Sequence, residues 1–240
     1  MRARVRVLAA LALVVGLMVP AAQPADAAAA SSALRGNSGH FKLHRMSDGS
    51  IIRWDPCKTI VWRFNPRQAP RGALKDVKTA FAKIAKVSGL RFRYGGTTSK
   101  VPRSSYGMRG PSSFGRLHLV VAWAQPGTGP GHSDLANDGV AGRGGFVYTY
   151  SYASGGKMHP EIQTGYVVLS TRYKWLPAGF ADGKSRRGGL LLHEIGHAVG
   201  LDHVNDTKMI MNPMLTRWNS LGAGDVVGLK KVGRSSGCIR

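Results

Sequence analysis

Residues 193–203 read His-Glu-Ile-Gly-His-Ala-Val-Gly-Leu-Asp-His, and this run constrains the fold more than any other part of the chain. His193 and His197 are four residues apart, so on a helix both imidazoles project from one face, about one turn apart. Glu194 lies beside the first histidine. Gly200 can adopt the left-handed conformation that ends a helix and reverses the chain, and this reversal can bring His203 to the same place.

Three neutral imidazole nitrogens that leave a fourth tetrahedral position for water or substrate form the coordination set of a catalytic zinc. A structural zinc is instead closed by four protein ligands. The spacing therefore predicts one catalytic Zn²⁺ held by His193, His197 and His203, with Glu194 as the catalytic base. The alternative is a helix with two surface histidines followed by an incidental third.

The same eleven residues are similar to the zinc signature of the metzincin peptidases, His-Glu-x-x-His-x-x-Gly-x-x-His. Metzincins place a methionine-bearing turn beneath the metal, and Met-Ile-Met-Asn-Pro follows here at residues 209–213. Met211 precedes Asn-Pro and resembles the turn of matrixins, so we assign the Met-turn to it. We expect Met209 and Met214 to fill the core. The chain resembles secreted bacterial matrixin-like proteases over residues 54–238, sharply only over residues 190–214.

This resemblance implies a zinc metalloendopeptidase, a hydrolase that cuts peptide bonds of proteins. Zinc lowers the pKa of a water molecule at the metal towards ~7, and Glu194 would take its proton as the water attacks the peptide carbonyl. Glu194 would then pass the proton to the departing amine. The chain contains no Gly-x-Ser-x-Gly motif for a serine nucleophile.

By the same resemblance, an extended substrate should pair with an edge strand within residues 142–150, at Gly144, Gly145 and Phe146. We expect the pocket beside the metal to accept medium or large apolar side chains. Its walls are expected to come from the helix and from the segment after the Met-turn, at Leu191, Leu192, Pro213, Met214, Leu215 and Thr216.

The order of elements predicts an α+β fold and fits the metzincin catalytic domain. The resemblance then implies a zincin-like domain with a twisted mixed five-stranded sheet, a zinc-binding active-site helix, a backing helix and a C-terminal helix. Alternation of apolar residues predicts the strands, and apolar residues three and four apart predict the helices. The expected strands cover residues 59–64, 90–94, 116–124, 144–150 and 165–170, and the expected helices residues 72–87, 187–199 and 224–232.

Residues 1–27 have the composition of a Sec-type signal peptide. Arg2, Arg4 and Arg6 precede an apolar stretch too short to span a bilayer, and small residues follow it. Cleavage is expected between Ala25 and Ala30, which predicts a secreted protein with no transmembrane segment in the mature chain; an uncleaved membrane anchor is the alternative. We expect a flexible segment at residues 28–45, a catalytic domain at residues 46–240 and a monomer.

Cys57 and Cys238 are the only cysteines, an even number in a chain expected to be exported. We predict a disulfide between them, worth up to roughly 5 kcal/mol because it closes so long a loop. The alternative is that one cysteine masks the zinc, as in latent animal matrixins, but this would leave the other unpaired.

Weaker candidates for metal binding are His132, Asp134, Asn137 and Asp138, in a glycine-rich loop where some matrixins hold Ca²⁺ or a second Zn²⁺. Their order does not match an EF-hand, and turn-forming residues explain them better. Asp202 is expected either to orient a ligand or to lie exposed in a turn. The remaining histidines lack partners at ligand spacing, so we expect surface or core positions for His40, His44, His118 and His159.

The formal charge of +22 indicates attraction to anionic material, such as cell-wall polymers. The basic residues are scattered, and no specific nucleic-acid motif is present. Two alternatives to a protein-cleaving enzyme stay open at this point. One is a hydrolase of cell-wall peptide bridges, and the other is a non-catalytic basic envelope-binding protein that retains structural zinc. The second has no use for the base Glu194.

Overall fold

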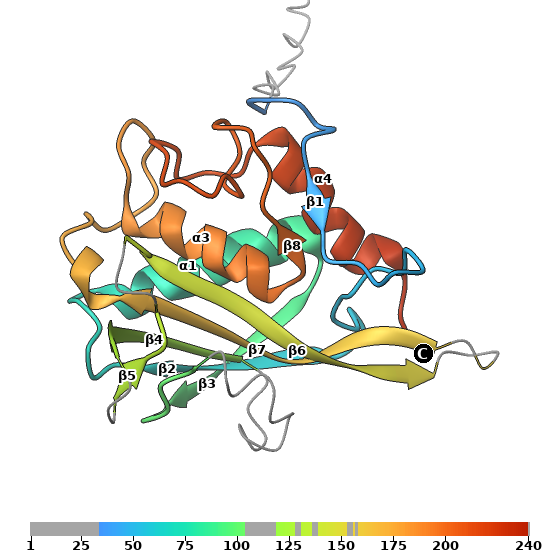
Figure 1. Ribbon diagram of the computed structural model, residues 1–240, viewed down its shortest axis with the longest axis horizontal. Helices are drawn as coiled ribbons and strands as arrows, with labels where there is room; N and C mark the ends of the chain where they lie inside the picture. Colours follow the sequence, from blue (N-terminus) through green and yellow to red (C-terminus); the bar gives the residue numbers. More distant parts are fainter. Residues whose placement is uncertain are drawn as a thin grey trace, which may run out of the picture. The chain divides into compact units, whose positions relative to one another are not determined.

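The computed structural model describes residues 34–103, 119–127, 131–135, 139–152, 156 and 158–239 (Figure 1). The predicted signal peptide, its alternative as a membrane anchor and the cleavage positions lie outside the described residues, as do residues 28–33 of the expected flexible segment. Within these ranges no helix has the length and apolar character needed to cross a membrane.

The sheet is mixed, as the sequence predicts. Its main path runs in the order β3-β2-β4-β7-β6. The first four strands are parallel, and β6 joins the end antiparallel to β7. The two-residue β5 pairs with β4, so the sheet has six strands among the described residues, where five were expected. The strands are β2 (Thr59–Asn65), β3 (Arg91–Thr97), β4 (Leu119–Pro126), β5 (His132–Ser133), β6 (Gly142–Tyr152) and β7 (Met158–Ser170).

Burial along the strands follows their position in the sheet. The central strand β4 is apolar and buried from Leu119 to Ala124, because its neighbours β2 and β7 flank it on both sides. The end strand β6 has no fully buried residue. β7 begins seven residues before the predicted start at residue 165, since Pro160, Glu161 and Thr164 interrupt its apolar pattern although all three are buried.

Two helices cover one face of the sheet, α1 (Ala73–Ser88) and α3 (Arg187–Ala198) (Figure 1). Val77, Phe81 and Ile84 carry the buried face of α1, and the ring of Phe81 stacks on Trp62 of β2 at 4.5 Å between centroids. A buried ion pair joins the two helices: Asp76 of α1 accepts from Arg187 at 2.7 Å. The described residues also form helix α4 (Ala223–Val232) and the 3₁₀ turns η2 (Thr171–Tyr173) and η3 (Arg234–Ser236).

The segment before residue 46 belongs to the folded unit, which begins at Leu34. Strand β1 (Lys42–Leu43) pairs antiparallel with β8 (Leu201–Asp202), directly before His203. Arg35 donates to the carbonyl of Lys208 at 2.8 Å and to the hydroxyl of Ser220 at 2.7 Å. The expectation of a flexible segment is therefore wrong for residues 34–45, because its polar groups find partners far away in the sequence.

Cys57 and Cys238 form the predicted disulfide, with their Cα atoms 5.5 Å apart across 181 residues of sequence. The bond fastens the C-terminal tail beside the start of β2. Both thiols are used, which excludes the alternative that one of them masks the metal site in this structure.

Candidate metal centre

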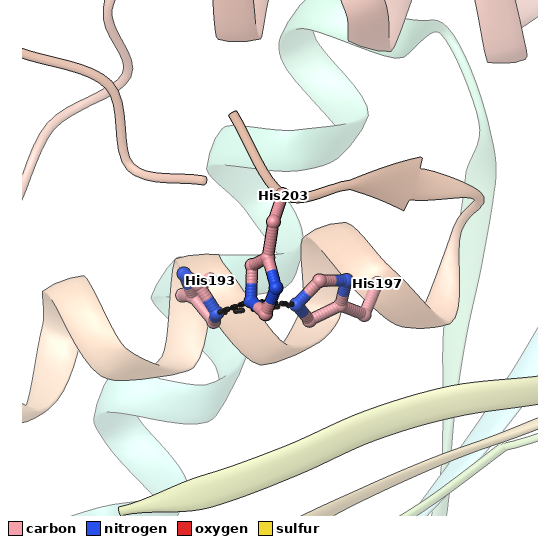
Figure 2. A group of neighbouring side chains, drawn as sticks. All are labelled: His193, His197 and His203. Carbon is pink, nitrogen blue, oxygen red and sulfur yellow. Dashed lines mark hydrogen bonds between the residues drawn. The ribbon is translucent and has the colours of Figure 1, made fainter. Parts of the chain in front are cut away.

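The three histidines of the motif converge on one point. His193 and His197 project from α3, and His203 comes from the segment after β8, with its ring pointing towards the other two (Figure 2). The Nε2 atoms lie 3.1 Å apart for His193 and His197, 3.2 Å for His193 and His203, and 3.0 Å for His197 and His203.

Backbone carbonyls fix the orientation of two of these rings. The Nδ1 of His193 lies 2.7 Å from the carbonyl oxygen of Ile210, and the Nδ1 of His197 lies 3.0 Å from that of Leu201. A carbonyl can only accept, so each Nδ1 carries the hydrogen and each Nε2 presents its lone pair. Burial lowers the pKa of His193 to about 4 and that of His197 to about 3, so both rings are neutral near pH 7.

Two lone pairs that face each other at 3.1 Å need a cation between them, because neither neutral ring can donate to the other. Zinc bonds imidazole nitrogen at about 2.0–2.1 Å, and in a tetrahedral set this separates two such nitrogens by roughly 3.3 Å. The spacing between the three Nε2 atoms is within a few tenths of an ångström of that value. The donor set therefore fits zinc, with His193, His197 and His203 as its holders.

The chain reversal that delivers His203 depends on Gly200, as the motif predicts. Its φ is +109°, and a Cβ at this position would lie 2.7 Å from the carbonyl oxygen of Ile52. Beyond it, Asp202 accepts from the backbone N–H of His203 at 2.7 Å and pairs with Lys42 at 3.0 Å. Asp202 thus holds the backbone of His203 in place.

Glu194 lies on α3 and faces Gly142 and Gly144 at the start of β6, in the same cleft as the three histidines. The side chain is 4% exposed, and burial raises the pKa of its carboxyl group to about 8, although a hydrogen bond from the backbone N–H of Gly144 works against this shift. α3 approaches β6 closely here. A Cβ on Gly142 would lie 2.6 Å from Oε1 of Glu194, and a Cβ on Gly144 would lie 1.9 Å from its carbonyl oxygen.

The turn after the motif packs against α3 through Met211. This residue is buried, and a Cβ on Gly196 would lie 2.5 Å from its Sδ, so the helix needs glycine where the methionine touches it. Met209 is fully buried, in agreement with the expected role in the core. The same expectation is wrong for Met214, which is 74% exposed because the chain has already left the core at Pro213.

Asp225 anchors this turn and was missed by the sequence analysis. Its carboxylate accepts from the backbone N–H groups of Ile210 at 2.7 Å, Met211 at 3.3 Å and Gly222 at 2.7 Å. Ile210 is also the residue whose carbonyl orients His193. Asp225 of α4 therefore fixes His193 indirectly: it binds the N–H of Ile210, and the carbonyl of Ile210 binds the imidazole. The only sequence signal was an acidic residue in the first turn of α4.

A cleft of about 640 Å³ opens over the three histidines and Glu194. Of the expected substrate-binding residues, Gly144, Pro213, Met214, Leu215 and Thr216 line it. Gly145 does not line the cleft, since a Cβ added to it would face the hydroxyl of Tyr166. Phe146 lies beyond the end of the cleft.

Leu191 and Leu192 do not wall the cleft, contrary to expectation. Both are fully buried in the core, and Gly189 and Leu190 line the cleft in their place. Helix periodicity explains the difference, since Leu190 is three residues before His193 and four before Glu194, and therefore shares their face.

The other histidines take varied positions. His44 was expected at the surface or in the core, but it lines the cleft, where its ring contacts Phe146 at 5.2 Å between centroids. The pairing of β1 with β8 brings it there, and nothing local in the sequence signals this. His40 pairs with Asp206 at 2.8 Å, His159 lies on β7, and His118 is outside the described residues.

The glycine-rich loop supplies no metal cluster in its described part. His132 lies on β5, and Asp134 is 3.9 Å from Arg143. Asn137 and Asp138 lie outside the described residues. The described residues of this loop therefore give no support for Ca²⁺ or a second Zn²⁺.

Comparison with curated proteins found no match. A family model described as Matrixin matches residues 152–232, which is less than half of the chain. The matched residues run from the last residue of β6 to the end of α4, so they contain all three histidines, Glu194 and Met211. Matrixins typically use zinc, and the match supports a metzincin-type, zinc-dependent peptidase in general.

Proposed function

We propose that this chain is a secreted zinc endopeptidase that hydrolyses internal peptide bonds of proteins. The observation that carries the proposal is the convergence of three imidazole nitrogens within 3.2 Å of one another, in a cleft that also holds Glu194. When bound to the three histidines, zinc would supply a Lewis acid that polarises the peptide carbonyl and acidifies water.

Glu194 is the proton carrier in this proposal. Burial raises the pKa of its carboxyl group, and the charge of a Zn²⁺ ion on the three histidines would lower it again. The carboxylate could then take a proton from the attacking water and return it to the leaving amine. The N–H of Gly144 holds the carboxylate in place. No nucleophilic serine or cysteine is required, in keeping with the use of both cysteines in the disulfide.

The cleft walls would bind the substrate. Among the described residues β6 is the end strand of the sheet, so an extended peptide could pair with its outer edge and add as a further strand. Met214 and Leu215, both exposed, provide apolar surface beside the metal site. We therefore expect a preference for medium or large apolar side chains next to the cleaved bond.

Secretion and a monomeric state are parts of the proposal that draw on the sequence. Residues 1–27 have signal-peptide composition. The disulfide is typical of an oxidising compartment outside the cytosol. The positive charge would favour retention on anionic cell-wall polymers.

The test compares the wild-type protein with Glu194→Ala, using zinc content and cleavage of a quenched peptide library as readouts. We expect equal zinc in both proteins and a loss of cleavage of about 10²–10⁴-fold in the variant, the usual contribution of a general base. Asp48→Ala, which removes a carboxylate from an exposed turn, is the control and should keep full activity. A chelator should abolish cleavage and added zinc should restore it.

Two results would contradict the proposal. Cleavage of purified cell walls without cleavage of casein or of any library peptide would favour a hydrolase of wall peptide bridges. Stoichiometric zinc without cleavage of either material would favour an envelope-binding protein whose zinc is structural.

A further inference from the structure

One face of the second half of β6 carries a row of aromatic side chains. Phe146, Tyr148 and Tyr150 alternate with other residues, so they share a face of the strand. Their ring centroids are 6.5 Å and 6.3 Å apart in succession, and Tyr152 is next in the alternation. We call these four residues the aromatic row. Its exposure rises along the strand, from 36% at Tyr148 to 50% at Tyr150 and 70% at Tyr152.

The aromatic row is continuous with the cleft over the metal site. His44 lines this cleft, and its ring meets Phe146 edge to face at 5.2 Å between centroids. From Phe146 the row extends away from the cleft for six residues, or about 20 Å at 3.3 Å per residue. A chain that leaves the cleft along β6 would therefore meet the tyrosines next.

The backbone along this half of β6 is also open to an added strand. Among the described residues β6 pairs with β7 alone and forms the end of the sheet. Proteins usually protect such edges with charged residues or proline. Residues 144–152 contain neither, in a chain with 34 lysines and arginines.

From these observations we infer that the second half of β6 is a docking surface for an extended segment of the substrate polypeptide, beyond the cleft that holds the cleaved bond. The inference builds on the proposed peptidase function and names its substrate class: unfolded or extended protein chains, not short peptide bridges. The added strand would pair with the β6 backbone, and its alternate side chains would contact the tyrosines. A polyanion is a poor occupant, because residues 144–152 offer it no positive charge.

The experiment measures binding without catalysis. Fluorescein-labelled, unfolded casein is titrated with the zinc-loaded Glu194→Ala protein, and the same protein carrying Tyr148→Ser and Tyr150→Ser is compared with it. We expect the Kd to rise about tenfold, the size of effect usual for removing interface tyrosines. The matched control is Thr149→Ala with Ser151→Ala, on the opposite face of the same strand, and should change the Kd less than twofold. Thermal unfolding of each variant checks that the fold is intact.

Equal casein affinity in the tyrosine variant and the control would overturn the inference. So would a tyrosine variant that keeps its casein affinity but loses retention on purified cell walls, since the row would then bind glycan. These results are distinguishable from failure of the peptidase proposal. A wild-type protein that cleaves no peptide contradicts that proposal, while the binding titration still decides whether the row docks polypeptide.

Discussion

The two halves of β6 lie on one strand at one edge of the sheet, yet the first is packed against α3 and the second is exposed to solvent. From Gly142 to Gly145 the strand passes over α3, where the backbone of Glu194 leaves no room for a side chain at Gly144. From Phe146 to Tyr152 it extends beyond the cleft and carries exposed aromatic rings. One edge strand can therefore have a first half packed tightly against a helix and a second half open to solvent, because each residue of a strand packs only against the groups next to it.

Gly144→Ala, in the packed first half of β6, should have the largest effect on stability and activity. The new Cβ would lie 1.9 Å from the carbonyl oxygen of Glu194, and backbone cannot rotate away as a side chain can, so α3 and β6 must separate. We expect a loss of about 3 kcal/mol in the free energy of unfolding, typical of severe overpacking, with no detectable peptide cleavage. Urea unfolding measures the first quantity. A variant as stable and active as the wild type would show that the two elements are not in close contact.

Gly142→Ala should separate activity from stability. Here the new Cβ would meet Oε1 of Glu194 at 2.6 Å and Cδ2 of Leu169 at 2.8 Å, and both are ends of flexible side chains that can move. We expect a cost of about 1 kcal/mol in stability. The kcat should fall about 10²-fold, because the displaced carboxylate is the proton carrier. A loss of stability without a loss of kcat would argue against Glu194 as the base.

Phe146→Ala probes the boundary between the two halves. Phe146 is partly buried and contacts His44, so its truncation should cost about 1–2 kcal/mol in the free energy of unfolding, below the value for a fully buried phenylalanine. Urea unfolding and the KM for a long peptide are the measurements. A loss of more than about 3 kcal/mol in the free energy of unfolding would show that Phe146 packs as tightly as a core residue and belongs to the first half of the strand.

Tyr150→Ser should have the smallest effect on the fold. Its side chain is half exposed on the end strand, and surface substitutions of this kind change stability by about 0.5 kcal/mol. The expected result is an unchanged unfolding midpoint in urea. A loss comparable to that of Phe146→Ala would mean that the row supports the fold and that its exposure is not reserved for binding.

Much of the metal centre could be predicted from the sequence, because its signals are local. Four-residue spacing puts His193 and His197 on one helical face, and Gly200 takes the positive φ that the reversal needs. The cysteine pair and the order of elements were equally accessible. Each of these features could be predicted from residues that are neighbours in the sequence or, for the disulfide, from the number of cysteines.

Most of the features that were missed depend on contacts between distant parts of the chain. His44 reaches the cleft only because β1 pairs with β8, and Asp225 binds a turn that lies some fifteen residues before it. Gly142 and Gly144 were expected to bind substrate or to lie on the edge strand, whereas the close approach of Glu194 is what requires glycine there. Helical phase would have corrected Leu191 and Leu192, since both lie off the face that carries His193 and His197.

X-ray absorption at the zinc edge of the purified wild-type protein, measured together with its metal content, decides whether the three histidines hold a catalytic zinc. We expect one zinc per chain, bound by three imidazole nitrogens at about 2.0–2.1 Å and one oxygen from solvent. A closed set of four protein ligands, a sulfur ligand or a chain that binds no zinc would contradict it.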